Sequence, residues 1–214
     1  MARPRRPLLT RSRIIECAIG IIDEEGLDAL STRRLATTLA VRAPSLYNHF
    51  ATKEEILDAV ADAIIAEVDL SMLGRDPWPD ALREWARGYR AVLVAHPNIV
   101  PFLARGPGKR PAQLRVADAV YGALIDGGWP PSLATRIGAL MRYLVAGSAL
   151  SSFALGFPAD PGLYTEAYPY LFDAHRLREH QTEVDEGAFE LGLSTLIGGL
   201  ETTFASLTAD TRSA

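Results

Sequence analysis

Two short helical segments, residues 32–39 and 43–49, are separated by a link of only three residues, and this spacing constrains the fold more than any other feature. Longer helical patterns flank the pair, at about 10–25 and 53–68. Apolar residues of the pair and its link are spaced to face one core. These residues are Leu35, Leu39, Val41 and Leu46. The sequence therefore predicts a helix-turn-helix inside a small helical bundle.

Stop and cap residues mark the ends of these helices. Gly26 follows the first apolar run, where glycine favours helix termination. Ser31 is a suitable N-cap for the next helix. Thr52 and Glu55 have the S/T-x-x-E spacing of a capping box. Phe50 and the apolar face of the helix that follows are expected to close the bundle.

The rest of the chain is also patterned for helices, and alternating β patterns are scarce. We therefore expect an all-α fold, with an N-terminal three-helix helix-turn-helix domain and a larger helical domain. Segment 70–80 contains glycine and two prolines and indicates a break between them. Further helices are expected at about 80–95, 98–104, 112–127, 132–156, 164–178 and 185–207.

The second helix of the pair carries more polarity than a buried helix needs. In APSLYNHF, residues 43–50, only Leu46 and Phe50 are expected core residues, and Pro44 fits the first turn, where its missing N–H costs nothing. The side chains left outside are Ser45, Tyr47, Asn48 and His49. In a helix-turn-helix the second helix enters the major groove of DNA. We therefore expect this helix to contact DNA.

Charge is unevenly distributed along the chain, which favours the same interpretation. The formal net charge is −4, but residues 1–53 hold nine Lys and Arg against five Asp and Glu. Phosphate contacts need cations, hydroxyls and helix N-termini, and candidates are Thr32, Arg33, Tyr47 and Lys53. A basic N-terminal arm could follow the DNA backbone or enter a minor groove; it consists of Arg3, Arg5, Arg6, Arg11 and Arg13. Each residue alone could equally be a solvated surface group.

The stretch GLDALSTRRLATTLAVRAPSLYNHFATKEEILDAV resembles the DNA-binding domain of the tetracycline-repressor (TetR) family. The shared pattern is a helix-ending Gly, a Thr/Ser-x-Arg-x-Leu/Ile-Ala helix, a Leu/Tyr-Tyr-x-His/Tyr-Phe segment and Lys-x-x-Leu-Leu. The resemblance implies a homodimeric transcriptional regulator, typically a repressor that leaves its DNA operator when a small molecule binds the C-terminal domain. It implies DNA-facing roles for Thr32, Arg33, Arg42, Pro44, Ser45, Tyr47, Asn48, His49 and Lys53.

Within this set we separate base reading from phosphate binding. Arg can form two hydrogen bonds with guanine and Asn with adenine, so base reading is expected from Arg42, Ser45 and Asn48. Phosphate binding is expected from Thr32, Tyr47, His49 and Lys53. His49 could instead pack under the motif without touching DNA. The expected domains are a DNA-binding domain at 1–53 with its arm at 1–13, a linking helix at 54–69, and a ligand-binding and dimerisation domain at 70–214.

The C-terminal part is more weakly similar to the tetracycline-repressor subgroup, in which two long helices pair with their copies in a four-helix dimer interface. Two apolar stripes fit such an interface; they contain Leu140, Leu144, Ser148 and Ser151 on one helix and Leu193, Leu196, Leu200 and Phe204 on the other. An intramolecular core would show the same spacing. Two-fold DNA half-sites require a dimer, which favours the interface.

A ligand pocket is expected within the helices of about 80–156, with mainly apolar walls and a few polar anchors. The candidates are Trp85, Tyr89, Phe102, Leu103, Arg105, Tyr121 and Met141, and each could instead be core packing or, for Arg105, a surface cation. The subgroup holds a magnesium–tetracycline chelate with a histidine and a carboxylate, whose places are taken here by Leu103 and about Ser151. Neither is a magnesium ligand. We therefore expect a metal-free, largely apolar ligand and no cofactor.

Other classes of protein fit less well. The four histidines lack zinc-site spacing, and no P-loop or nucleophile elbow is present, so an enzyme is not expected. A purely structural helical dimer would leave the polar helix and the basic arm without a reason. The single cysteine, Cys17, rules out an internal disulfide. No signal peptide is visible and the longest uncharged run, residues 143–157, is short for a membrane span, so a cytoplasmic location is expected.

Overall fold

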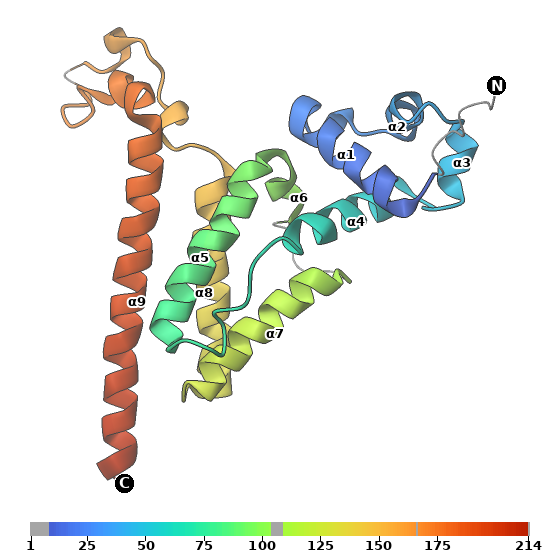
Figure 1. Ribbon diagram of the computed structural model, residues 1–214. Helices are drawn as coiled ribbons and strands as arrows, with labels where there is room; N and C mark the ends of the chain where they lie inside the picture. The colour runs from blue at the N-terminus through green and yellow to red at the C-terminus, as the bar shows by residue number, and fades with distance from the viewer. Residues whose placement is uncertain (1–8, 104–108, 166, 214) are drawn as a thin grey trace. The chain divides into compact units, whose positions relative to one another are not determined.

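The computed structural model describes residues 9–103, 109–165 and 167–213, and every regular element in these ranges is helical (Figure 1). The prediction of an all-α fold is therefore confirmed. The chain forms two compact units, each discontinuous in sequence. The N-terminal unit is Met1–Glu67 with His96–Arg115, and the C-terminal unit is Val68–Ala95 with Val116–Ala214. The division at 1–53, 54–69 and 70–214 concerns functional roles and stays a prediction.

The N-terminal unit is a small helical bundle. Its helices are α1 (Arg11–Glu25), α2 (Thr32–Thr38), α3 (Ala43–Tyr47), α4 (Lys53–Ile65) and α6 (Val100–Leu103), with short 3-10 turns η1 (Leu27–Ala29) and η2 (Pro97–Ile99). The core contains Ile14, Ile22, Leu35, Leu46, Phe50, Ile56, Val60 and Ile64. Leu39 and Val41, which were also expected in the core, are only half-buried. Cys17 is half-buried too, and this burial raises the pKa of its thiol.

The predicted caps are present at the starts of α2 and α4. The Ser31 hydroxyl accepts a hydrogen bond from the backbone N–H of Arg34 at 3.1 Å. The Thr52 hydroxyl accepts from the N–H of Glu55 at 3.1 Å. The Glu55 carboxylate turns back as a capping box requires, but it accepts from the N–H of Ala51 at 2.8 Å rather than from Thr52. Both helix starts are thus fixed by local side chains.

The turn between α2 and α3 is a Schellman motif with an alanine in the left-handed position. Ala40 has a φ of 54°. Its N–H donates to the carbonyl of Thr37 at 3.2 Å, and the N–H of Val41 donates to Ala36 at 3.0 Å. Left-handed alanine costs roughly 1 kcal/mol, and the two hydrogen bonds of the turn offset that cost. Gly26, by contrast, ends α1 with a φ of 89°, as the glycine signal predicted.

The C-terminal unit is built on three long helices. These are α5 (Trp78–Ala95), α8 (Pro131–Leu150) and α9 (Gln181–Ser213), and each of them packs against the other two. The helix α7 (Pro111–Asp126) enters this unit at Val116. The ring centroid of Trp129 lies 5.4 Å from that of Trp78 and 5.1 Å from that of Phe204, so an aromatic cluster joins α9 to the start of α5.

Three arginines on one side of α5 form ion pairs with glutamates on α9. Nitrogen–oxygen distances are 3.2 Å for Arg83–Glu201, 2.7 Å for Arg87–Glu190 and 2.8 Å for Arg90–Glu186. The hydrogen bonds from Arg87 hold the pKa of Glu190 below its usual value. Arg90 is the buried member, with 8% of its side chain exposed, and its guanidinium carbon lies 4.7 Å from the centre of the Phe189 ring.

The segment after α8 differs from the prediction. The expected helix 132–156 ends at Leu150, and Ser151 has extended backbone angles. The N–H of Phe153 donates to the Asp185 carboxylate at 3.0 Å instead of continuing the helix. The helix expected at 164–178 is wrong as well. Between α8 and α9 the regular elements of the described residues are the 3-10 turns η3 (Ala154–Gly156), η4 (Pro161–Leu163) and η5 (Ala174–His180). Helix α9 starts four residues earlier than expected and extends beyond 207.

Candidate nucleic-acid interface and ligand pocket

Helix α3 is anchored by one face and leaves the other open. Leu46 is 1% exposed, whereas Tyr47 is 55% exposed and Asn48 is also exposed. His49 is half-buried, and its N–H donates to the carbonyl of Leu46 at 2.9 Å. Of the other residues predicted for this helix, Arg42 and Pro44 are exposed and Ser45 is half-buried. Arg42, Ser45 and Asn48 are three residues apart in turn, which places them along one side of the helix.

Several of the predicted DNA-contacting side chains make no polar contact with other described residues. In the part of the chain that the structure describes, no hydrogen bond or ion pair engages the side chains of Arg33, Arg42, Tyr47, Asn48 and Lys53. Lys53 is exposed at the first residue of α4, beside Glu54. Thr32 is half-buried at the start of α2. Exposed donors without internal partners are available to an external acceptor such as phosphate.

Other arginines of this unit are engaged internally, among them Arg34 and Arg11. Arg34 pairs with the Glu25 carboxylate through two nitrogens, the shorter distance being 2.5 Å, and donates to the Thr38 hydroxyl at 2.7 Å. The hydrogen bonds from Arg34 lower the pKa of Glu25. Arg11, predicted as part of the basic arm, is instead the first residue of α1, and its side chain turns to the carbonyl of His49. Arg3, Arg5 and Arg6 lie outside the described residues.

The predicted pocket residues are mostly buried. Trp85, Tyr89, Phe102, Leu103 and Met141 are each at most 5% exposed, Tyr121 is half-buried, and Arg105 lies outside the described residues. Phe102 and Leu103 belong to the N-terminal unit and the others to the C-terminal unit, so their grouping into one pocket stays a prediction.

Local contacts place some of these residues on neighbouring elements. The rings of Trp85 and Tyr89 lie 5.6 Å apart on α5. The Tyr121 ring occupies the space above Gly138, where a Cβ would come within 2.3 Å of it. The indole N–H of Trp85 is buried without a hydrogen-bond acceptor among the described residues.

The predicted dimer stripe of α9 packs largely within its own chain. Leu193 is 1% exposed, and Leu196, Leu200 and Phe204 are half-buried. An intramolecular core therefore accounts for much of this stripe. On α8, Leu144 and Ser148 are half-buried, Leu140 is 45% exposed, and Ser151 lies just beyond the helix end.

Three strongly exposed apolar side chains lie close to these stripes in sequence and were missed in the prediction. Tyr143 on α8, Leu191 on α9 and Phe153 after α8 are 67%, 71% and 64% exposed. Each is one to three residues away from a predicted stripe residue, so a wider stripe would have included them. A role in an interface remains a prediction for both sets.

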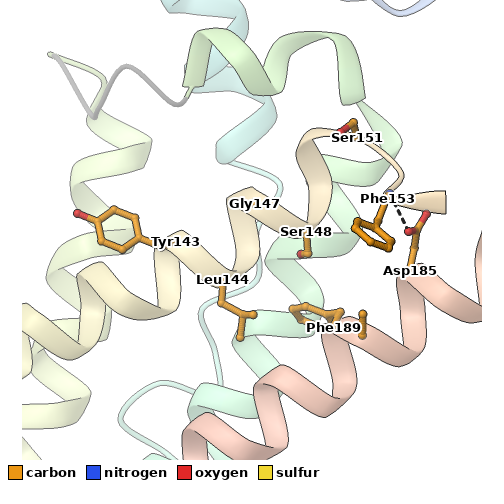
Figure 2. A pocket seen from close by; sticks show the side chains of 9 residues that line it. Tyr143, Leu144, Gly147, Ser148, Ser151, Phe153, Asp185 and Phe189 are labelled. Atoms are coloured by element: carbon orange, nitrogen blue, oxygen red, sulfur yellow. Dashed lines mark hydrogen bonds between the residues drawn. The ribbon is translucent and has the colours of Figure 1, made fainter. Parts of the chain in front are cut away.

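A hollow of about 340 Å³ lies between α8 and the first turns of α9 (Figure 2). Its lining residues are Tyr143, Leu144, Gly147, Ser148, Ser151, Phe153, Asp185, Ala188 and Phe189. Figure 2 shows the Asp185 carboxylate bonded to the backbone of Phe153, so this acid is already used to fix the chain after α8. The hollow thus combines the predicted interface residues Leu144, Ser148 and Ser151 with exposed aromatic rings.

The described residues contain no cluster of three or more His, Cys, Asp or Glu side chains placed to hold a metal ion. None of the helices in these ranges has the length and apolar character needed to cross a membrane.

Comparison with known proteins gives consistent matches for both parts of the chain. Residues 14–60 match the family model "Bacterial regulatory proteins, tetR family", and residues 71–204 match "Tetracyclin repressor-like, C-terminal domain". The chain is 34% identical over 205 residues to the tetracycline repressor protein class C of Escherichia coli, covering 90% of this chain and 91% of that protein. It is 32% identical over 151 residues to an HTH-type transcriptional regulator of Saccharopolyspora erythraea, covering 71% of this chain but only 60% of that protein.

A solved structure is also similar to this chain. It is that of ActR, a TetR family protein of Streptomyces coelicolor, in complex with (S)-DNPA. The TM-score is 0.74 with 30% sequence identity, and the similarity covers 91% of this chain and 98% of the other.

Proposed function

The chain belongs to the TetR family of DNA-binding transcriptional regulators, and from that premise we propose that it represses transcription from a palindromic operator until a small, metal-free and largely apolar ligand binds its C-terminal part. A homodimer would place two copies of α3 in successive major grooves, one helical turn of DNA apart. In a bacterial regulator this activity is exerted in the cytoplasm.

The observation that carries the proposal is the open face of α3. Leu46 fixes the helix to the core, while the side chains of Tyr47 and Asn48 are exposed and have no hydrogen-bond partner among the residues that the structure describes. Arg42 lies at the N-terminal end of the helix, where helix-turn-helix proteins contact base edges. A structural dimer without DNA binding offers no reason to leave these donors unpaired.

A second set of contacts supports the response to a ligand. Helix α5 leads directly into the segment 96–99, which is bonded to the C-terminal end of α1. The Nδ1 of His96 lies 2.8 Å from the Asp23 carboxylate. The Asn98 amide donates to the carbonyls of Ile22 and Asp23 at 2.8 and 3.2 Å. The Ile22 carbonyl also accepts from the N–H of Gly26, the C-cap of α1, at 2.9 Å, so the Asn98 amide adds a second bond at the end of this helix. A movement of α5 would therefore be transmitted along the chain to residues 96–99, and from there through their hydrogen bonds to α1 of the DNA-binding bundle.

The linking helix α4 is held in a similar way. The Asp62 carboxylate on α4 accepts a hydrogen bond from the backbone N–H of Ala112, in the first turn of α7, at 2.6 Å. Two segments that flank α6 are thus bonded to two helices of the DNA-binding bundle. Coupling of about 1–3 kcal/mol between ligand and operator is typical of such switches.

The ligand class is inferred from the candidate pocket. The resemblance to the subgroup puts Leu103 in the place of a metal-binding histidine. Within the C-terminal unit, the candidate residues Trp85, Tyr89 and Met141 are buried and are aromatic or apolar. The unpaired Trp85 N–H offers one donor, so we expect a ligand with a large apolar body and at least one oxygen acceptor. ActR binds an organic small molecule, (S)-DNPA, which supports this class without identifying the ligand.

Selection of bound duplexes from a random DNA pool tests the proposal. We expect enrichment of a palindrome whose half-site centres are about one helical turn apart. Binding of the selected duplex should weaken steeply with salt, because phosphate contacts release counterions. A pool that shows no enrichment, or binding that does not depend on salt, would favour the structural dimer.

A further inference from the structure

We propose that Arg11 is a positioning residue that fixes the recognition helix α3 by holding the turn after it, and that it does not belong to a phosphate-binding arm. The effect on operator binding rests on the proposed function, but the contact itself exists in the free protein. Nothing in the sequence pattern separates Arg11 from the other basic residues near the N-terminus.

Helix α3 needs support from outside because it has only five residues, Ala43–Tyr47. Helices of this length are not stable alone, since few hydrogen bonds compensate for the ordered backbone. At its C-terminal end the N–H groups of His49 and Phe50 both donate to the carbonyl of Leu46, at 2.9 and 3.0 Å. The orientation of α3 therefore depends on how this turn is held.

Arg11 supplies a long-range contact to the turn. It is the first residue of α1, whose start is fixed by the Thr10 hydroxyl through a 3.2 Å bond from the N–H of Arg13. The Nη1 of Arg11 donates to the carbonyl of His49, 38 residues away. The guanidinium carbon also lies 3.9 Å from the centre of the Phe50 ring, which is a favourable cation–π geometry. Phe50 is 2% exposed, so the guanidinium joins α1 to a residue of the core.

The bonded carbonyl lies next to the residues that should read DNA. His49 follows Asn48, an expected base reader, and precedes Lys53 at the start of α4 by four positions. Without the contact, the α3–α4 turn would sample more orientations and base-edge contacts would be lost. Phosphate contacts tolerate such freedom better, because they carry no sequence information. Loss of Arg11 should therefore lower selectivity more than general affinity for DNA.

The salt dependence of DNA binding distinguishes a positioning role of Arg11 from a phosphate-binding role. A side chain that neutralises one phosphate contributes about 0.9 to the slope of log affinity against log salt. Arg11 in the positioning role contributes nothing to this slope. Arg33 provides a matched control, since it is exposed and unpartnered among the described residues.

The experiment uses Arg11→Met and Arg33→Met in the full chain, with the selected operator and a scrambled duplex of equal length. Arg11→Met is expected to lower operator affinity about tenfold, or about 1.4 kcal/mol, with the salt slope and the scrambled-duplex affinity unchanged. Arg33→Met should lower both affinities and reduce the slope by about 0.9. A reduced slope in Arg11→Met, or an unchanged operator affinity, overturns the proposal.

Amide hydrogen exchange of the free protein gives a second readout that needs no DNA. The N–H groups of His49 and Phe50 should exchange faster in Arg11→Met than in the wild type and in Arg33→Met, while Ile22 in α1 stays protected. Unchanged exchange at the turn, or equally faster exchange at Ile22, counts against a local positioning role. If the wild type prefers no duplex, the proposed function fails and exchange alone decides the role of Arg11.

Discussion

Arginines are used in opposite ways at the α3 surface and at the α5–α9 contact. On α5, Arg83, Arg87 and Arg90 all pair with glutamates of α9. Around α3, the side chains of Arg33 and Arg42 have no such partner in the described part of the chain. Positive charge by itself therefore does not mark a nucleic-acid interface. The informative property is an exposed donor that the fold leaves unsatisfied.

The largest effect is expected for an arginine at the α5–α9 contact. Arg90→Ala should lower the free energy of unfolding by about 3 kcal/mol, since it removes a buried side chain that packs on Phe189 and pairs with the half-exposed Glu186, and it leaves a cavity. Arg87 is 54% exposed, and Arg87→Ala should cost less than about 1 kcal/mol. Urea denaturation of both variants measures the difference. Equal losses would show that burial does not set the value of these pairs.

Around α3, substitution of a residue expected to contact bases should change the selectivity for the operator over other duplexes. Asn48→Ala is expected to reduce the preference for the selected operator by about 1–3 kcal/mol, because each bidentate base contact contributes that much discrimination. Competition between the operator and duplexes changed at single positions gives the measurement. The scrambled duplex serves as the control, and its affinity should stay close to that of the wild type. A uniform loss on all duplexes would assign Asn48 to phosphate instead.

Tyr47 should behave in the opposite way. Tyr47→Phe removes only the phenol oxygen and should weaken binding to every duplex by about 1 kcal/mol, the typical net contribution of one hydrogen bond. The ranking of the duplexes should stay the same. Binding isotherms on operator and scrambled DNA test this, and a change in ranking would move Tyr47 into the base-reading group.

The smallest effect is expected on protein stability, from a substitution in the turn between α2 and α3. Ala40→Gly should raise the stability by up to about 1 kcal/mol, since glycine adopts the positive φ of 54° without a steric cost. Thermal unfolding followed by circular dichroism measures the change, and Ala51→Gly is a suitable control because Ala51 does not have a positive φ. A loss of stability in Ala40→Gly would show that alanine contributes packing at the turn.

The helical bundle could be predicted from sequence because its signals are local. Gly26, Ser31 and Thr52 act within one helical turn, and each ends or starts a helix where expected. The end of α8 could not be predicted in this way. It depends on a hydrogen bond between Phe153 and Asp185, which lie 32 residues apart. The link at 40–42 was predicted, but the left-handed conformation of Ala40 was not, because glycine is the usual residue at such a position.

The candidate site shows the same limit. Spacing placed Tyr47 and Asn48 on the exposed face of α3, and the structure brings them there. Spacing alone did not distinguish Arg11 and Arg34, which have internal partners, from Arg33, whose side chain has none within residues 9–103, 109–165 and 167–213. Those partners come from distant parts of the chain, so the available and the engaged cations can be told apart only in the folded protein.

The central claim is tested most directly by two neighbouring residues, Arg33 and Arg34. The measurement is the salt slope of operator binding for the wild type, Arg33→Ala and Arg34→Ala. Arg33 has no side-chain partner among the described residues, whereas Arg34 is bonded to Glu25. The slope should therefore fall by about 0.9 for Arg33→Ala and stay unchanged for Arg34→Ala. Equal slopes for the two variants, or a fall only for Arg34→Ala, would contradict the view that unsatisfied donors define this interface.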